Sequence, residues 1–341
     1  MNSFLAAAAA LALAVPSHAV EPEDARLSAE SAFAAAAIEL PALGLAPLAA
    51  APQPPKVCSE LDFGGVTWPG ALTEDDRAAL EIALNISGSF EGGDAWANIS
   101  DNFDGQGVSL GLLNQNLGQG SLQPMLIRLR DEHLETLKAL LSPEHLDSLL
   151  AMLAEWRSAA ADESTPGPLS ALDNPEERGG PVATAANKAS VDWAVANLYV
   201  EGGFAPLWKG ELKALASSRD YVSIQIAAAV AAHDRAVAVE KPVGVRELRD
   251  YLFLYDVYVQ NGGLYAQDLA DYADYVKKTP EAGATARLEE LLELRLRHVR
   301  KQYVADVRSR KLAIIRGTGS VHGEPRNLPG QYCYDGLWPY R

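Results

Sequence analysis

Apolar residues recur at helical spacing through most of the chain after residue 72, the pattern of helices that bury one face. The first predicted helix starts after Thr73, where Asp76 completes a capping-box variant, and Gly88 is placed to end it. Further helices are predicted over 121–141, 143–161, 186–200, 206–216, 219–240, 244–260 and 265–277, and a long one from Thr279 to about Arg310. The pattern therefore predicts a mainly α fold.

Residues 88–124 interrupt the helical pattern with the sequence GSFEGGDAWANISDNFDGQGVSLGLLNQNLGQGSLQP. The segment is rich in glycine and polar side chains, which a helical core does not require. Gly105 and Gly107 favour tight backbone geometry and fit a short β-hairpin. We therefore expect a small β element here, and its side chains are the candidates for catalytic groups.

The domain organisation follows from changes in composition. Residues 20–57 are rich in alanine and proline and predict a linker. A folded domain is expected over 58–341, with a first helical lobe at about 58–161 and a second at about 185–341. The turn-rich residues 162–184 connect the lobes, and the β-hairpin belongs to the first.

The N-terminus has the pattern of a signal peptide. Residues 4–15 form an apolar run, too short to span a bilayer, and small side chains predict cleavage after Ala19. A buried, alanine-rich first helix is the alternative for residues 1–19. No other stretch is expected to cross a membrane, so the protein is predicted to be secreted or periplasmic, without stable membrane insertion.

Cys58 and Cys333 lie near the two ends of the expected domain. An oxidising compartment favours a disulfide between them, which in the chain-entropy model stabilises by ~4–5 kcal/mol. Two unpaired thiols are the alternative. Two cysteines alone form no zinc site, and the six histidines show no metal-binding spacing, so no metal or cofactor is expected.

The formal net charge of −16 restricts the partners. Such a surface repels nucleic acid and anionic membranes and attracts cationic polymers. We expect no nucleic-acid partner and a monomeric protein.

Two carboxylates in residues 88–124 have contrasting environments. Glu91 follows the first helix and Phe90, and both the helix dipole and desolvation there favour a protonated carboxyl. Asp104 lies in a glycine-rich turn that favours an exposed, ionised carboxylate. Such a pair suits glycosidic-bond cleavage, in which one group protonates the leaving oxygen and the other activates water. A solvated loop without chemistry is the alternative.

The order SFEGG, DGQG, SLGLLNQN resembles the lysozyme-like superfamily, and most closely the family 46 chitosanases with their D-G-R-G-Y-T-x-G-I-I-G-F motif. The resemblance implies an α+β lysozyme-like fold with a cleft between the lobes. It places Glu91 and Asp104 at the two catalytic carboxylates. Gln106 stands where that family has arginine, which bears on the substrate.

The resemblance extends into the second lobe. The sequence LFLYDVYVQNGG places Asp256 at the family's buried aspartate, and a late helix matches two family arginines with Arg295 and Arg308. The resemblance implies that these three side chains form an ion-pair network behind Asp104. A solvated basic helix face is the alternative for the two arginines.

The expected function is that of an exported glycoside hydrolase acting on a β-1,4-linked amino-sugar polymer. The polar floor of the segment favours peptidoglycan, whereas the net charge favours chitosan. The expected substrate-binding side chains are Gln106, Ser109, Asn114, Gln115, Asn116, Gln119 and Tyr255. His322 is expected in a surface loop, and a place at the rim of the cleft is the alternative. A non-catalytic protein that binds cell-wall glycans is the alternative from another class.

Overall fold

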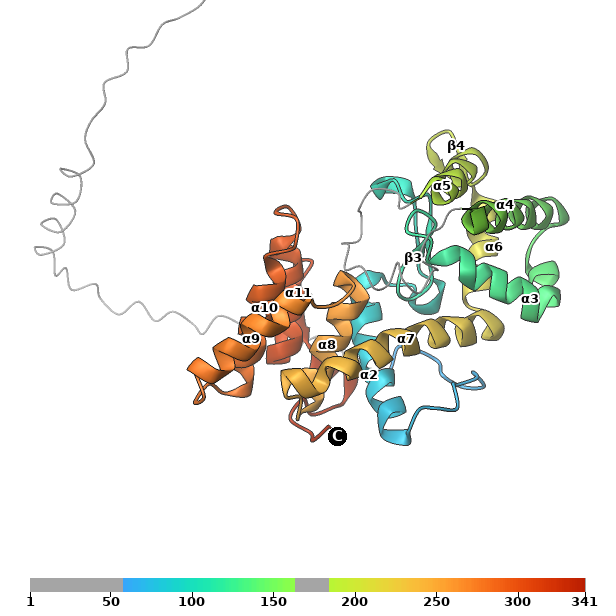
Figure 1. Cartoon of the computed structure of the whole chain (residues 1–341). Coiled ribbons are helices and arrows are strands. Elements are labelled where there is room, and N and C mark those ends of the chain that lie inside the picture. Colours follow the sequence, from blue (N-terminus) through green and yellow to red (C-terminus); the bar gives the residue numbers. More distant parts are fainter. Residues whose placement is uncertain (1–57, 163–183, 341) are drawn as a thin grey trace, which may run out of the picture. The chain divides into compact units, whose positions relative to one another are not determined.

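The computed structural model describes residues 58–162 and 184–340 (Figure 1). The predicted signal peptide (1–19) and linker (20–57) lie outside these described residues, as does nearly all of the connecting segment. The described chain is mainly helical with small antiparallel sheets, so the predicted mainly α class is confirmed.

The helices up to α9 follow the predicted order. The helices of the described chain are α2 (Glu74–Glu91), α3 (Leu122–Leu140), α4 (Pro143–Asp162), α5 (Ala185–Asn197), α6 (Pro206–Ala216), α7 (Arg219–Val243), α8 (Leu248–Asn261), α9 (Ala266–Lys278), α10 (Ala284–Leu296), α11 (Val304–Arg316) and α12 (Leu328–Tyr332).

Helix α2 begins as predicted but ends later. The Thr73 hydroxyl accepts a bond from the backbone N–H of Asp76 at 3.1 Å, which caps the first turn. The prediction that Gly88 ends the helix is wrong, because α2 continues to Glu91. A Cβ at Gly88 would lie 2.8 Å from Leu112 Cγ and closer still to a terminal methyl. Gly88 is therefore the point where a neighbouring segment packs closely against the helix.

The predicted long helix from Thr279 to Arg310 is also wrong, because residues 297–303 separate α10 from α11. Tertiary contacts explain this break better than a local breaker residue. Arg295, near the end of α10, donates to the carbonyls of Asn261 and Gly263, each at 2.8 Å. His298, just after α10, lies 2.9 Å from the Asp268 carboxylate on α9.

The segment between α2 and α3 forms the small β element that was predicted. Strands β1 (Ile99–Ser100), β2 (Ser109–Leu110) and β3 (Gln115–Asn116) form one antiparallel sheet in the order β1-β2-β3. Two short 3-10 turns accompany them, η1 (Ala95–Ala97) and η2 (Asn102–Asp104). Gly105 and Gly107 have φ of 79° and 82°, the left-handed conformation that glycine adopts readily. We call residues 95–116 the β-segment.

Two further hairpins complete the strands: β4 (Tyr199–Val200) pairs with β5 (Gly203–Phe204), and β6 (Thr318–Val321) pairs with β7 (Glu324–Asn327). In the second hairpin Val321 faces Glu324, so that two residues form the turn.

Two hydrophobic cores divide the domain differently from the predicted lobes. The first core joins Val108 and Leu110 of the β-segment to α3, α4, α5 and α6. The second joins α2 to α8 through α12 and includes Trp96, Leu112 and Leu113 of the β-segment. Helix α2 therefore packs with helices from the second half of the chain, and α5 and α6 pack with α3 and α4 from the first half. The two cores do not coincide with the two predicted lobes. Helix α7 contributes to both cores and extends from one group of helices to the other (Figure 1).

Helix α7 is long and apolar enough, by length and composition, to cross a membrane, which the sequence prediction missed. Many of its side chains nevertheless pack in the interior of the domain. Tyr221 packs in the first core and Ile226 in the second, and the polar Gln225, His233 and Glu240 are buried along it. These contacts are typical of a central core helix.

The disulfide between Cys58 and Cys333 is formed, as predicted. Next to it, the backbone N–H of Cys58 donates to the carbonyl of Gln331 at 2.8 Å. The bond closes the first described residues onto the last helix, α12. A disulfide is consistent with the predicted exported compartment.

Candidate active site

A cleft of about 230 Å³ is lined by three parts of the chain. The end of α2 contributes Phe90 and Glu91, next to Arg310 from α11. The β-segment contributes Ser100, Phe103, Asp104, Ser109, Asn114 and Asn116. The remaining side, here called the helical wall, consists of Gln260, Asn261, Tyr303, Asp306, Val307 and His322.

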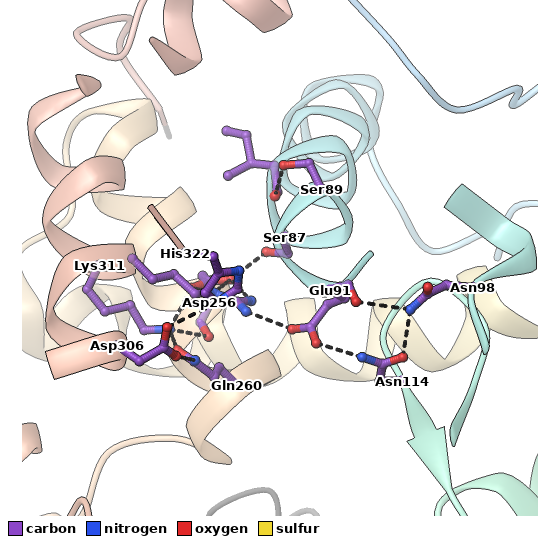
Figure 2. Close-up of polar contacts among 12 residues, drawn as sticks. Ser87, Ser89, Glu91, Asn98, Asn114, Asp256, Gln260, Asp306, Lys311 and His322 are labelled. Carbon is purple, nitrogen blue, oxygen red and sulfur yellow. Dashed lines mark hydrogen bonds and ion pairs between the residues drawn. The ribbon is translucent and has the colours of Figure 1, made fainter. Parts of the chain in front are cut away.

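Glu91 is the last residue of α2, and its side chain is only 8% exposed. Arg310 Nη1 donates to Glu91 Oε1 at 2.7 Å, and Asn114 Nδ2 donates to Oε2 at 2.9 Å. Asn98 Nδ2 donates both to the Glu91 carbonyl at 3.2 Å and to Asn114 Oδ1 at 2.8 Å (Figure 2). The carboxylate is therefore held in one orientation from both sides.

Arg310 also binds a second, fully buried carboxylate. Its Nη2 and Nε donate to the two oxygens of Asp256 at 2.6 and 2.9 Å. Lys311 Nζ donates to Asp256 Oδ2 at 2.5 Å, and the Ser87 hydroxyl donates to Oδ1 at 2.7 Å. Glu91, Arg310, Asp256 and Lys311 thus alternate in sign, and we call them the charge row.

The pKa directions in the charge row follow from burial and from neighbouring charges. Burial alone would raise the pKa of Asp256, but the charges of Arg310 and Lys311 outweigh it and hold that pKa below its ordinary value. Burial lowers the pKa of Lys311 to about 7 against the attraction of Asp256. For Arg310 burial is outweighed by Asp256 and Glu91, which raise its pKa.

Asp104 reaches the same cleft from the β-segment. It ends the η2 turn, which Asp101 caps by accepting a bond from the Phe103 N–H at 3.2 Å. Asp104 Oδ1 accepts a bond from the backbone N–H of Gln106 at 3.1 Å, and the side chain is half-buried. Left-handed Gly105 permits the reversal that follows. The structure therefore brings both predicted carboxylates, Glu91 and Asp104, to one cleft.

The predicted substrate-binding residues divide into two groups. Ser109, Asn114 and Asn116 line the cleft, and the sheet places Ser109 directly opposite Asn116. Gln106, Gln115, Gln119 and Tyr255 are not among the lining residues. Gln106 is buried and accepts a bond from Gln119 Nε2 at 3.2 Å, so both shape the β-segment from inside. Tyr255 is fully buried in the second core.

The supporting residues also differ from the prediction. Asp256 is buried and ion-paired as expected, but its partners are Arg310 and Lys311. Arg308, predicted as a partner, pairs with Glu293 on the surface at 2.6 Å. Arg295 binds the carbonyls of Asn261 and Gly263 at the end of α8. The charge row includes Glu91, whereas the resemblance had implied a network behind Asp104.

Several lining residues were missed by the sequence analysis. Phe103 (83% exposed) and Tyr303 (38% exposed) are aromatic side chains open to solvent, and Asp306 pairs with His322 at 3.0 Å. Asp306 and Arg310 lie four residues apart, on one face of α11, a spacing that could have indicated a common site. His322 lines the cleft from an exposed turn, which agrees with the alternative place at the cleft rim.

No group of three or more His, Cys, Asp or Glu side chains that could hold a metal ion occurs in the described ranges. A scan against protein-family models found no family that matches this chain, and a search of curated proteins found no relative.

Proposed function

We propose that the protein is an exported glycoside hydrolase that cleaves β-1,4 linkages in an amino-sugar polymer. One observation carries this proposal: Glu91 at the end of α2 and Asp104 at the end of η2 line the same cleft. Two carboxylates at one cleft are the working groups of most glycoside hydrolases.

In this proposal Glu91 protonates the oxygen of the leaving sugar as the glycosidic bond breaks. Asp104 takes a proton from the attacking water or stabilises the positive charge that develops on the sugar ring. Asn114 fixes the direction in which the carboxyl points.

The order of elements supports a lysozyme-like arrangement. A helix that ends in glutamate, a turn that holds aspartate and a short three-stranded sheet follow each other along the chain, as in the motif that the sequence resembles. Exposed aromatic rings on two sides of the cleft, Phe103 and Tyr303, suit stacking on sugar faces.

Peptidoglycan is the favoured substrate because the β-segment offers neutral polar groups, Ser109, Asn114 and Asn116, to the cleft. Chitosan is the second candidate, since the net charge of −16 attracts a polycationic chain.

Release of reducing ends from purified peptidoglycan and from chitosan, measured side by side, tests the proposal. We expect release from one polymer by the wild type, and its loss in Glu91→Gln with the fold retained. Equal release by wild type and Glu91→Gln would overturn the assignment. Absence of release from both, with retained binding to one of them, would favour the non-catalytic glycan-binding protein.

A further inference from the structure

The helical wall presents a histidine that the proposed reaction does not use. His322 occupies the two-residue turn of the β6–β7 hairpin with a left-handed φ of 54°. Val321 before it is buried in the second core, which fixes the hairpin against the helices. His322 Nε2 lies 3.0 Å from Asp306 Oδ1 on α11, so the imidazole is held in place at the cleft although its side chain is 51% exposed.

A chain of contacts joins this histidine to the charge row. Gln260 Nε2 donates to Asp306 Oδ2 at 3.4 Å, and Gln260 Oε1 accepts a bond from Lys311 Nζ at 2.7 Å (Figure 2). Gln260 is therefore oriented by a buried ammonium and in turn supports the carboxylate that holds His322. Such support for a side chain that faces a cleft is typical of a binding site.

Few carboxylates of the cleft are available to a polycationic ligand. Three carboxylates line it, and two of them are already paired: Glu91 with Arg310 and Asp306 with His322. A polymer of free amines needs carboxylates that are available to its ammonium groups. Asp104 is the third carboxylate of the described lining, and its Oδ1 accepts a bond from the backbone N–H of Gln106.

A neutral amide on the helical wall also favours an acetylated ligand. Asn261 lines the cleft and is 2% exposed, and its Oδ1 has no hydrogen-bond partner within the described residues. An acetamido group carries an N–H and a C=O, so it pairs with an amide side chain and with imidazole in either protonation state. An ammonium group only donates, so it can use only an acceptor atom in the site, whereas the acetamido group can use donors and acceptors.

We propose that His322, held by Asp306, is a specificity residue that binds the acetamido group of an N-acetylated amino sugar and disfavours a free amine. This inference rests on the proposed function and names the substrate class of the same cleft.

Direct binding tests the inference without turnover. Calorimetry on the Glu91→Gln protein compares N-acetylglucosamine oligomers with glucosamine oligomers of equal length. Adding His322→Asn, which tolerates the left-handed turn, is expected to weaken binding of the acetylated oligomer about tenfold, the effect of one lost hydrogen bond in a site. Affinity for the free-amine oligomer is expected to stay within about twofold.

The matched control is His133→Asn, which removes a half-exposed histidine from α3 that pairs with Asp220. It is expected to leave both affinities unchanged. Asp306→Asn, which keeps the side-chain shape and removes the charge, is expected to weaken binding of the acetylated oligomer, as His322→Asn does.

Equal losses for both oligomers, unchanged affinity for the acetylated one, or binding of neither would overturn the inference. Failure of the proposed function is a separate result. If the protein binds selectively through His322 but releases no reducing ends, the proposed hydrolase function is wrong and the role of His322 in specificity stands. If it releases reducing ends but binds both oligomers equally well, the hydrolase function stands and the specificity inference is wrong.

Discussion

The guanidinium of Arg310 donates to the carboxylate of Glu91 at 2.7 Å and, with the same group, binds the fully buried Asp256. The residue that the proposal makes the general acid is thus tied to an ion-paired network deep in the second core. Removal of one member of a buried pair leaves an uncompensated charge, which is far more costly than the loss of a surface pair.

Arg310→Met is therefore expected to lower the free energy of unfolding by about 3–5 kcal/mol, the cost of an unpaired buried charge. Urea denaturation followed by circular dichroism measures it. The control is Arg308→Met on the same helix, where the pair with Glu293 is exposed and a change below about 1 kcal/mol is expected. Similar losses in the two variants would contradict the account of the charge row.

The buried Lys311 makes the free energy of unfolding depend on pH in a direction that can be predicted. Burial lowers its pKa to about 7 from the ordinary lysine value of 10.5. Between these values the unfolded chain binds more protons than the folded one, so the contribution of Lys311 to the free energy of unfolding increases with pH. We expect wild type to gain stability relative to Lys311→Met between about pH 7 and about pH 9.5. Urea unfolding of both proteins at the two pH values measures the difference, and a constant difference would contradict this prediction.

The disulfide between Cys58 and Cys333 closes a loop with a sequence separation of 275 residues. Replacing both cysteines by serine is expected to lower the free energy of unfolding by about 2–5 kcal/mol. Thermal unfolding with and without reductant measures it, since reductant acts on the wild type and not on the double variant. A wild type that is insensitive to reductant, with its disulfide shown to be reduced, would count against this role.

Gly88 is predicted to resist a substitution that helices usually favour. A Cβ there would overlap the Leu112 side chain, so Gly88→Ala is expected to cost about 1–3 kcal/mol of stability through overpacking. The control is Gly210→Ala in α6, where a Cβ meets no atom within 4 Å and a gain of about 1 kcal/mol is expected. Denaturation of the two variants tests this directly, and a gain in both would refute the close approach.

The sequence predicted what depends on local patterns. The start of α2 could be predicted because Thr73 carries its own cap, and the turn at Gly105 and Gly107 because few other residues adopt that conformation. The end of α2 was misplaced because Gly88 serves packing against Leu112, a contact between segments that no local pattern contains.

The site was predicted in part for the same reason. Glu91 and Asp104 belong to one short motif, whereas the partners of Asp256 lie on a helix about fifty residues further along the chain. Arg308 and Arg310 are both basic residues of α11, and only packing decides which one faces inward: Arg310 is buried and Arg308 is exposed. A surface loop was preferred to the cleft rim for His322 because a two-residue turn carries no sequence signal for what it packs against.

The initial rate of glycosidic-bond cleavage in the susceptible polymer tests the central claim most directly, measured for wild type, Glu91→Gln, Asp104→Asn and the double variant. We expect each single variant to lose at least about a hundredfold. The double variant is expected to be little worse than the weaker single one, because the two groups act on one bond. Glu81→Gln, on the same helix in an exposed pair with Arg77, is the control and keeps the wild-type rate. Wild-type rates in either single variant would contradict the assignment of this cleft as the active site.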